Sequence, residues 1–309
     1  MKLWFASSQA FQIQLTALYD LVNPTASAMW NLRWQVKGYL DERESASTQE
    51  LHGRFVAGSG IGSANLRRHC VERTWEEQIG ELVLLGTFSA IGLYEGWVDA
   101  LEVGSAAQKR RLQFPSRGID GRTEMGVNDT VSALQATRST SLDLAYGPIL
   151  RSSRRYIPAR LDDMLACYRC FKEVRNAYAH AGRIPDTYAQ TAYANAVPRA
   201  GGLGKDGRDI ELPVVTAGQP VQLSLLHIQA LCALLLNMVI TLDAELAVTR
   251  AAEAVFLNRW RNVISFAEAP ADPIRRRTRI RVMNNRVGYP TPSDTEALYG
   301  LLRNAMLVI

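Results

Sequence analysis

Residues 225–248 read LLHIQALCALLLNMVITLDAELAV, and this stretch is apolar nearly all the way round a helix. Apolar side chains recur along it at helical spacing, from Leu226 and Ile228 to Leu242 and Leu246. A helix without a polar face is stable in water only when other helices surround it. The stretch therefore predicts a helical bundle with residues 225–248 in its middle.

Two further long helices are predicted by apolar residues that recur every three or four positions. One spans residues 74–102 and closes at Gly104, and the other spans 159–181 and stops at Gly182. Shorter helices are expected over residues 11–22, ending before Pro24, over 25–40 and over 293–307.

The remaining segments are expected to be irregular or extended. Residues 209–216 and 221–224, joined by Ala-Gly-Gln-Pro, predict a short β-hairpin, and residues 105–140 show weak periodicity. The glycine-rich run 58–65 predicts a loop. Since no strand precedes it and no Gly-Lys-Ser/Thr ends it, a phosphate-binding loop is not indicated. The expected fold is mainly α, an up-and-down helical bundle with a short β-hairpin and a small mixed C-terminal appendage.

The composition of the 309-residue chain is that of a globular protein, with 47% apolar and 21% charged residues. Four cysteines do not make a disulfide framework, which favours a reducing cytoplasm. The first residues lack the unbroken apolar core of a signal peptide. The apolar stretch 231–242 is interrupted by Asn237 and is shorter than the ~20 residues that a membrane span needs. We expect a cytoplasmic protein that does not associate with membranes.

Positive charge is concentrated at the C-terminal end of the chain. Of the net charge of +5, most lies in residues 251–309, which hold nine arginines, five acids and no lysine. Guanidinium groups bind phosphate in a bidentate manner, so the segment favours a nucleic-acid partner, although a solvated basic tail is an equal alternative. An extended segment would place Arg277, Arg279 and Arg281 on one face, about 7 Å apart. The candidate nucleic-acid-binding residues are Arg275, Arg276, Arg277, Arg279 and Arg281.

The strongest chemical signal is the segment Val174-Arg175-Asn176-Ala177-Tyr178-Ala179-His180-Ala181-Gly182. On a helix, Arg175 falls within about 20° of Tyr168, in the middle of the apolar stripe. An arginine at such a position is costly unless it is paired or functional. His180 stands in the last turn, where the helix dipole favours its protonated form. A guanidinium, an amide and an imidazole together suit a phosphodiester, although a buried ion pair and a satisfied histidine are the commoner explanation.

The pattern Arg175-Asn176-x3-His180 resembles the signature of the HEPN superfamily: an arginine, a polar residue, three to five others and a histidine near the end of a late helix. The order of the expected helices is also similar, with one long early helix, the Arg…His helix and a closing helix after a short extended segment. The resemblance covers about residues 70–249. We therefore divide the chain into an N-terminal helical extension (1–69), a HEPN-like bundle (70–249) and an Arg-rich appendage (250–309).

This resemblance implies a metal-independent endoribonuclease that cleaves RNA through attack of the ribose 2′-hydroxyl. Arg175 would stabilise the phosphorane, His180 would act as general acid or base, and Asn176 would orient one of them. Glu95, on the predicted helix 74–102, is a possible polar partner for Arg175 or an ordinary surface acid. The family also implies a homodimer with two motifs in one cleft, and a role in toxin–antitoxin or anti-phage systems with an antitoxin or defence partner protein. The alternative function is a catalytically inactive scaffold that binds a protein or RNA.

Other chemistries find little support in the sequence. Cys167 and Cys170 have the spacing of half a zinc site, but no second pair follows and the two thiols point about 60° apart on a helix. We therefore expect no metal and no cofactor. The six tryptophans occupy helical positions and are expected in the core rather than on a base-stacking surface.

Overall fold

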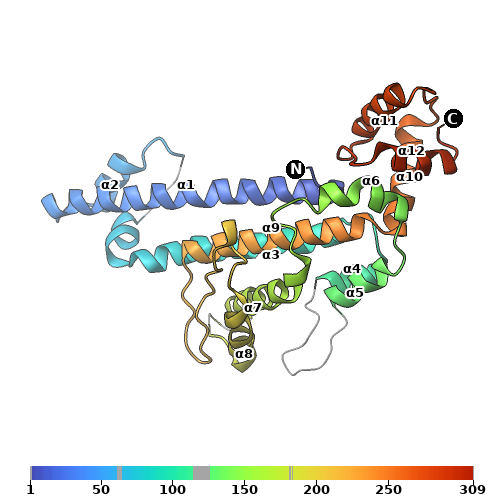
Figure 1. The fold of residues 1–309 in the computed structure, drawn as a ribbon. Helices are drawn as coiled ribbons and strands as arrows, with labels where there is room; N and C mark the ends of the chain where they lie inside the picture. Colours follow the sequence, from blue (N-terminus) through green and yellow to red (C-terminus); the bar gives the residue numbers. More distant parts are fainter. Residues whose placement is uncertain (1, 61–64, 114–125, 181, 183, 309) are drawn as a thin grey trace.

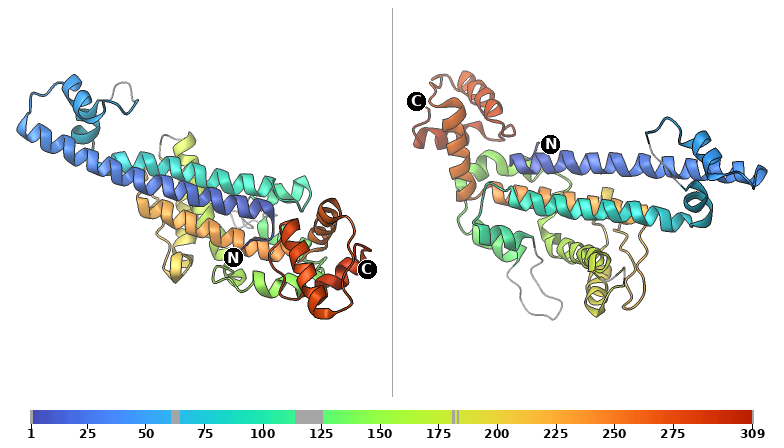
Figure 2. Two further views of the ribbon diagram at one scale, coloured as in Figure 1. Left: turned by 90° about the horizontal axis from the view of Figure 1, so that it is seen from above. Right: turned by 180° about the vertical axis from the view of Figure 1, so that it is seen from behind.

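The computed structural model of the protein describes residues 2–60, 65–113, 126–180, 182 and 184–308. The chain is mainly α-helical, as expected. Helices α1 (Ala6–Glu42), α3 (Trp75–Asp99) and α9 (Leu225–Ala247) pack against one another lengthwise, and both views in Figure 2 show them side by side. Helices α7 (Leu161–His180) and α8 (Thr187–Ala196) pack together on one side of this body (Figure 1).

Helix α9 is the central element, as its sequence predicts. Leu231, Leu234 and Leu235 are completely buried, and even Asp243 has no exposed surface. The Asp243 carboxylate accepts backbone N–H groups of Trp4 at 2.8 Å and Phe5 at 3.1 Å, which fastens the start of the chain to α9. Burial raises the pKa of Asp243 to about 6, and these backbone donors oppose the rise. Helices α3 and α9 are long and apolar enough to cross a membrane by length and composition, yet in this fold both pack within the bundle.

Helix α1 differs from its prediction, because Pro24 lies inside one continuous helix instead of separating two. A proline costs a helix one hydrogen bond and a steric clash. Val22 and Ala26, on either side of Pro24, are each only 3% exposed. The close fit at this point is shown by Gly86 of α3, where an added Cβ would lie 3.4 Å from Val22. Burial against α3 and α9 therefore outweighs the local preference of the sequence.

The predicted β-hairpin does not form. Residues 209–224 are extended around a turn in which Gln219 N–H donates to the Thr216 carbonyl at 3.1 Å, but the two arms make no ladder. Ile210 N–H donates to Ala200 and Gly218 N–H to Pro185, so backbone bonds go to neighbouring segments instead. Across the described residues no strand is formed, and the only pairings are two isolated bridges. The topology of the bundle as HEPN-like stays a prediction.

The C-terminal appendage is helical in its described residues, not mixed α/β. It consists of α10 (Arg250–Ile264), α11 (Pro273–Val287) and α12 (Thr295–Asn304), and α12 packs on α6 (Thr140–Leu150). Aromatic side chains join it to the start of the chain: the Tyr289 ring lies 4.6 Å from that of Trp4 and 4.8 Å from that of Phe256. The first and last segments of the chain therefore share one core.

Several short helices complete the fold. A second, smaller core lies at the C-terminal end of α1. Its buried residues are Val36, Leu40, Ala46, Leu51, Val56, Leu66 and Cys70. The region 105–140, expected to be irregular, contains two of the short helices, with residues 114–125 outside the described part; residues 61–64 of the glycine-rich run also lie outside it. The division at residues 69 and 249 stays a prediction. The short elements are α2 (Thr48–Phe55), η1 (Arg68–Glu72), α4 (Ala106–Leu112), α5 (Val127–Gln135), η2 (Pro158–Arg160), η3 (Val197–Arg199) and η4 (Lys205–Gly207).

Candidate functional site

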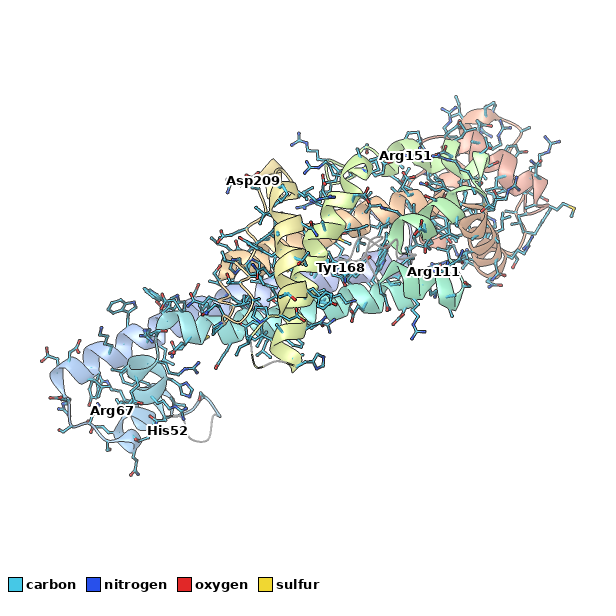
Figure 3. The ribbon with its side chains drawn as sticks, turned by 90° about the horizontal axis from the view of Figure 1, so that it is seen from below. His52, Arg67, Arg111, Arg151, Tyr168 and Asp209 are labelled. Carbon is cyan, nitrogen blue, oxygen red and sulfur yellow. The ribbon has the colours of Figure 1, made fainter. Side chains whose placement is uncertain are left out.

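Helix α7 carries the Arg…His motif and is placed by its apolar face. It begins after the short η2 turn with two acids, Asp162 and Asp163, in its first turn, where the helix dipole favours negative charge. Met164, Tyr168 and Phe171 are almost completely buried, and α7 packs against α3, α8 and α9. Seen from below, Tyr168 lies near the middle of the molecule, and His52 and Arg67 lie at one of its ends (Figure 3).

Arg175 lies against an acid of the neighbouring long helix. Its Nη2 is 3.3 Å from Glu95 Oε1 on α3, and the ammonium of Lys172 lies 3.2 Å from the same oxygen. The three side chains are largely buried, with Arg175 23%, Lys172 14% and Glu95 30% exposed. Two cations therefore share the Glu95 carboxylate. We call these three residues the Arg175 cluster.

The Arg175 cluster also contains polar atoms without partners. The Nε of Arg175 and the hydroxyl of Tyr168 are both buried, and neither forms a hydrogen bond to any described residue. Such groups are costly to bury unless a ligand or water completes them. Burial raises the pKa of Tyr168 and lowers that of Lys172, and the Glu95 carboxylate opposes the change at Lys172. The Lys172 ammonium lies 5.9 Å from the centre of the Tyr168 ring, so the tyrosine forms one wall of the cluster.

His180 is not part of the Arg175 cluster. It is the last residue of α7 and is exposed, and no described residue bonds to its side chain. Five residues of α-helix separate it from Arg175 by about 140° around the axis and about 7.5 Å along it. The amide of Asn176 donates to Glu173 at 3.4 Å instead of contacting either residue. The structure thus joins Arg175 to Glu95, and it leaves Asn176 and His180 on other faces of the helix.

Lys172 is the residue that the sequence analysis did not single out. It precedes Arg175 by three positions, and residues three apart on a helix are neighbours. That spacing was a usable signal, because a second cation beside a buried arginine requires a shared acid. The acid itself lies 77 positions before Lys172 in the sequence and is brought there by the packing of α3 on α7.

The arginine-rich segment forms a helix, which overturns the expected extended row of Arg277, Arg279 and Arg281. Asp272 caps α11, accepting the Arg275 N–H at 2.8 Å, Pro273 is its first residue, and Gly288 ends it with φ +101°. Asp-Pro at the start and Gly after the end are typical helix signals. In a helix, residues 277 and 279 lie about 200° apart, so they do not share a face.

Four of the five arginines proposed to bind nucleic acid form no ion pair with a described acidic residue. Arg275, Arg277, Arg279 and Arg281 are exposed, and no ion pair joins them to a described residue. Arg276 differs: it lies 2.8 Å from Glu296 and 4.6 Å from the centre of the Tyr299 ring. Helical geometry places Arg275 and Arg279 on one side together with the exposed Arg286. Figure 1 shows α11 at one end of the long helices, away from α7 and α8.

The cysteines lie in the core. Burial raises the pKa of Cys167 to about 12 and raises that of Cys170 as well, so both thiols stay protonated at neutral pH. Within the part of the chain that the structure describes, no three His, Cys, Asp or Glu side chains gather as a metal site would require. The tryptophans divide: Trp4, Trp97 and Trp260 are buried as expected, whereas two others are substantially exposed.

Comparison of the chain with models of known families, with curated proteins and with solved structures gives no match.

Proposed function

We propose that this protein is a metal-independent endoribonuclease that uses the Arg175 cluster and His180. The observation that carries the proposal is the cluster itself: a largely buried guanidinium with an unused Nε–H, beside Lys172, with one carboxylate between two cations. A buried guanidinium with a free N–H donor suits the oxygen atoms of a phosphodiester. The resemblance of Arg175-Asn176-x3-His180 to the HEPN signature supports the same activity.

In the proposed reaction the ribose 2′-hydroxyl attacks the adjacent phosphorus. The 2′-oxygen loses its proton to a base and the departing 5′-oxygen receives a proton from an acid, which leaves a 2′,3′-cyclic phosphate and a 5′-hydroxyl. His180 fits the proton-transfer role, because an exposed imidazole at the end of α7 is reachable by RNA. Arg175 stabilises the negative charge on the phosphorane, and Glu95 holds its side chain in place.

A homodimer is part of this proposal. Because Arg175 and His180 face different sides of α7, one chain does not present both to the same phosphate. Two copies that meet at the ends of their α7 helices bring two motifs into one cleft, so that groups from both chains surround the scissile bond. Light scattering of an active sample should report a dimer; an active monomer at micromolar concentration would contradict this arrangement.

The rest of the proposal concerns the setting of the reaction. The exposed arginines of α11 bind RNA phosphates without reading sequence, and Arg276 contributes to folding. We place the protein in the cytoplasm as a toxin or anti-phage effector with an antitoxin or other defence partner. The second candidate is an inactive RNA- or protein-binding scaffold. One observation favours it: Arg175 is ion-paired with Glu95, and His180 lies outside the Arg175 cluster.

The test compares total RNA after expression of wild type and of His180→Ala. We expect cleavage by the wild type and a loss of at least ~100-fold in the variant, the scale of an acid–base group. Cleavage of purified RNA should persist in EDTA and leave 2′,3′-cyclic phosphate ends. Activity that vanishes in EDTA and returns with Mg²⁺ would overturn the metal-independent mechanism, and intact RNA in every sample would leave the scaffold function.

A further inference from the structure

A groove of about 780 Å³ lies where the extended segment 209–224 meets the first turns of α3 and α9. It lies outside the Arg175 cluster and shares no residue with it. Most of its wall is apolar, and the side chains that matter most are Trp75, Ile79, Leu212, Val214, Leu223 and Leu226. This groove is therefore a separate concave surface, built by three segments that are far apart in the sequence.

The apolar wall is open to solvent. Val214 and Leu226 are 67% and 53% exposed, which are high values for large apolar residues, and both line this groove. The wall continues onto α1, because the Trp75 ring lies 5.0 Å from that of Trp30, which lies 5.6 Å from that of Trp34. Exposed aromatic and aliphatic side chains that adjoin in this way are typical of binding surfaces.

One arm of the groove has the pattern of an unpaired β-strand. Pro213 and Val215 are buried against the protein, while the intervening Leu212, Val214 and Thr216 line the groove. The N–H groups of these three residues donate no hydrogen bond to any described residue. An exposed extended edge with free backbone groups is a template for the addition of another strand.

The charges of the groove select its occupant. Its ionisable lining residues are Glu76, Glu211 and His227, with no lysine or arginine among them, although the whole chain carries +5. Burial lowers the pKa of His227, which Glu211 opposes, so the imidazole is neutral at pH 7. His227 Nδ1 accepts the Ser224 N–H at 3.0 Å, so its proton is on Nε2, 3.7 Å from Glu211. The groove is thus negatively charged in a basic protein.

We propose that this groove binds an extended segment of a partner protein in which apolar residues alternate with polar ones and include lysine or arginine. The segment adds as a strand to the 212–216 arm, its apolar side chains pack against Trp75 and Leu226, and its cation lies beside Glu211. Backbone carbonyls of the segment accept hydrogen bonds from the free N–H groups of this arm. The buried hydroxyl of Ser224, which has no partner, offers a further hydrogen bond in the groove. This interaction does not depend on the ribonuclease activity.

The test is selection of peptides from a phage-displayed library of random linear sequences on the full-length protein. We expect enrichment of peptides that alternate apolar and polar residues and carry lysine or arginine. One enriched peptide, synthesised with a fluorophore, should bind Val214→Asp and Leu226→Asp at least ~10-fold more weakly, the loss typical of a central apolar contact. Leu85→Asp is the matched control, because Leu85 is 67% exposed on α3 outside the groove, and it should bind as the wild type does.

Charge reversal distinguishes charge-selective binding in this groove from nonspecific apolar binding. Glu211→Lys should weaken the binding of the selected peptide. The same variant should bind more tightly a copy of the peptide in which glutamate replaces the basic residue. All four substitutions are at residues more than half exposed, so circular dichroism and melting should match the wild type. The proposal is overturned if no peptide is enriched, if the enriched peptides are acidic, or if they bind the Val214 and Leu226 variants as tightly as the wild type.

Discussion

The end of α7 and the surface of α11 both present arginine, under opposite physical conditions. Arg175 is largely buried, shares Glu95 with Lys172 and has a buried Nε–H without a partner, so the ion pair holds its charge at one place. The arginines at 275, 277, 279 and 281 are exposed and meet no acid among the described residues. A fixed, partly desolvated charge can act on one bond, whereas a mobile, hydrated group of charges attracts a polyanion without selecting a position. Under the proposed function, the contrast predicts that α7 carries the chemistry and that α11 contributes affinity.

The largest expected effect comes from exchanging the two kinds of arginine for glutamine. Arg175→Gln should lower RNA cleavage by at least ~100-fold at saturating RNA, because it removes the charge that stabilises the phosphorane in the proposed reaction. Arg279→Gln, the matched control on α11, should cleave at nearly the wild-type rate under the same conditions. Single-turnover cleavage of a labelled RNA measures both. Equal losses in the two variants would break the contrast between chemistry and affinity.

An intermediate effect is expected within α11 itself. Replacing Arg275, Arg279 and Arg286 together by glutamine should weaken RNA binding and reduce its dependence on log salt by about 2–3 slope units, since these side chains lie on one side of the helix. Its melting temperature should stay near that of the wild type. Fluorescence anisotropy across a salt series, with a thermal melt of the same samples, provides both measurements.

Arg276→Gln is the control for that experiment. It removes the 2.8 Å ion pair with Glu296 and the contact with the Tyr299 ring, so it should lower the melting temperature by about 2–4 °C while changing the salt dependence least. If the triple variant melts several degrees lower and keeps the wild-type salt slope, the exposed arginines stabilise the fold and do not bind RNA.

The smallest expected effect concerns the acid that holds Arg175. Glu95→Gln leaves Lys172 and Arg175 without their shared counter-charge, and we expect the free energy of unfolding to fall by about 1 kcal/mol, since these groups are only partly exposed. Lys172→Met in the same chain should restore part of the loss by removing one of the two cations. Denaturant unfolding of the two single variants and the double variant measures the coupling. Strict additivity would show that Glu95 and Lys172 do not interact.

The sequence predicted the long helices well, for a local reason. In residues 225–248 the apolar side chains surround the helix, and in residues 159–181 they form a stripe that glycine terminates. Such patterns depend only on helical geometry and on burial, and the observed α9 and α7 agree with them within two residues at each end. The residues Asp272, Pro273 and Gly288, which are typical of helix ends, also flank the arginines. The alternation of arginine with threonine and isoleucine favoured an extended segment instead.

Other features were decided by contacts between distant segments. Pro24 predicts a break, but the packing of α1 on α3 and α9 keeps the helix continuous. Residues 209–224 have the composition of a hairpin, yet their backbone bonds go to Ala200 and Pro185, so the arms do not pair. The same segment lines the groove beside Trp75.

The candidate site shows the same division between local and long-range causes. The sequence by itself determined that Arg175 stands in the apolar stripe of a helix and that His180 ends it, because both follow from the period of the helix. Only the tertiary structure decided that Glu95 reaches Arg175, that Lys172 shares that acid, and that His180 stays in solvent. Ion pairs form between side chains that packing brings within a few ångströms, and the pattern of one helix carries no information about which residue of another helix will face it.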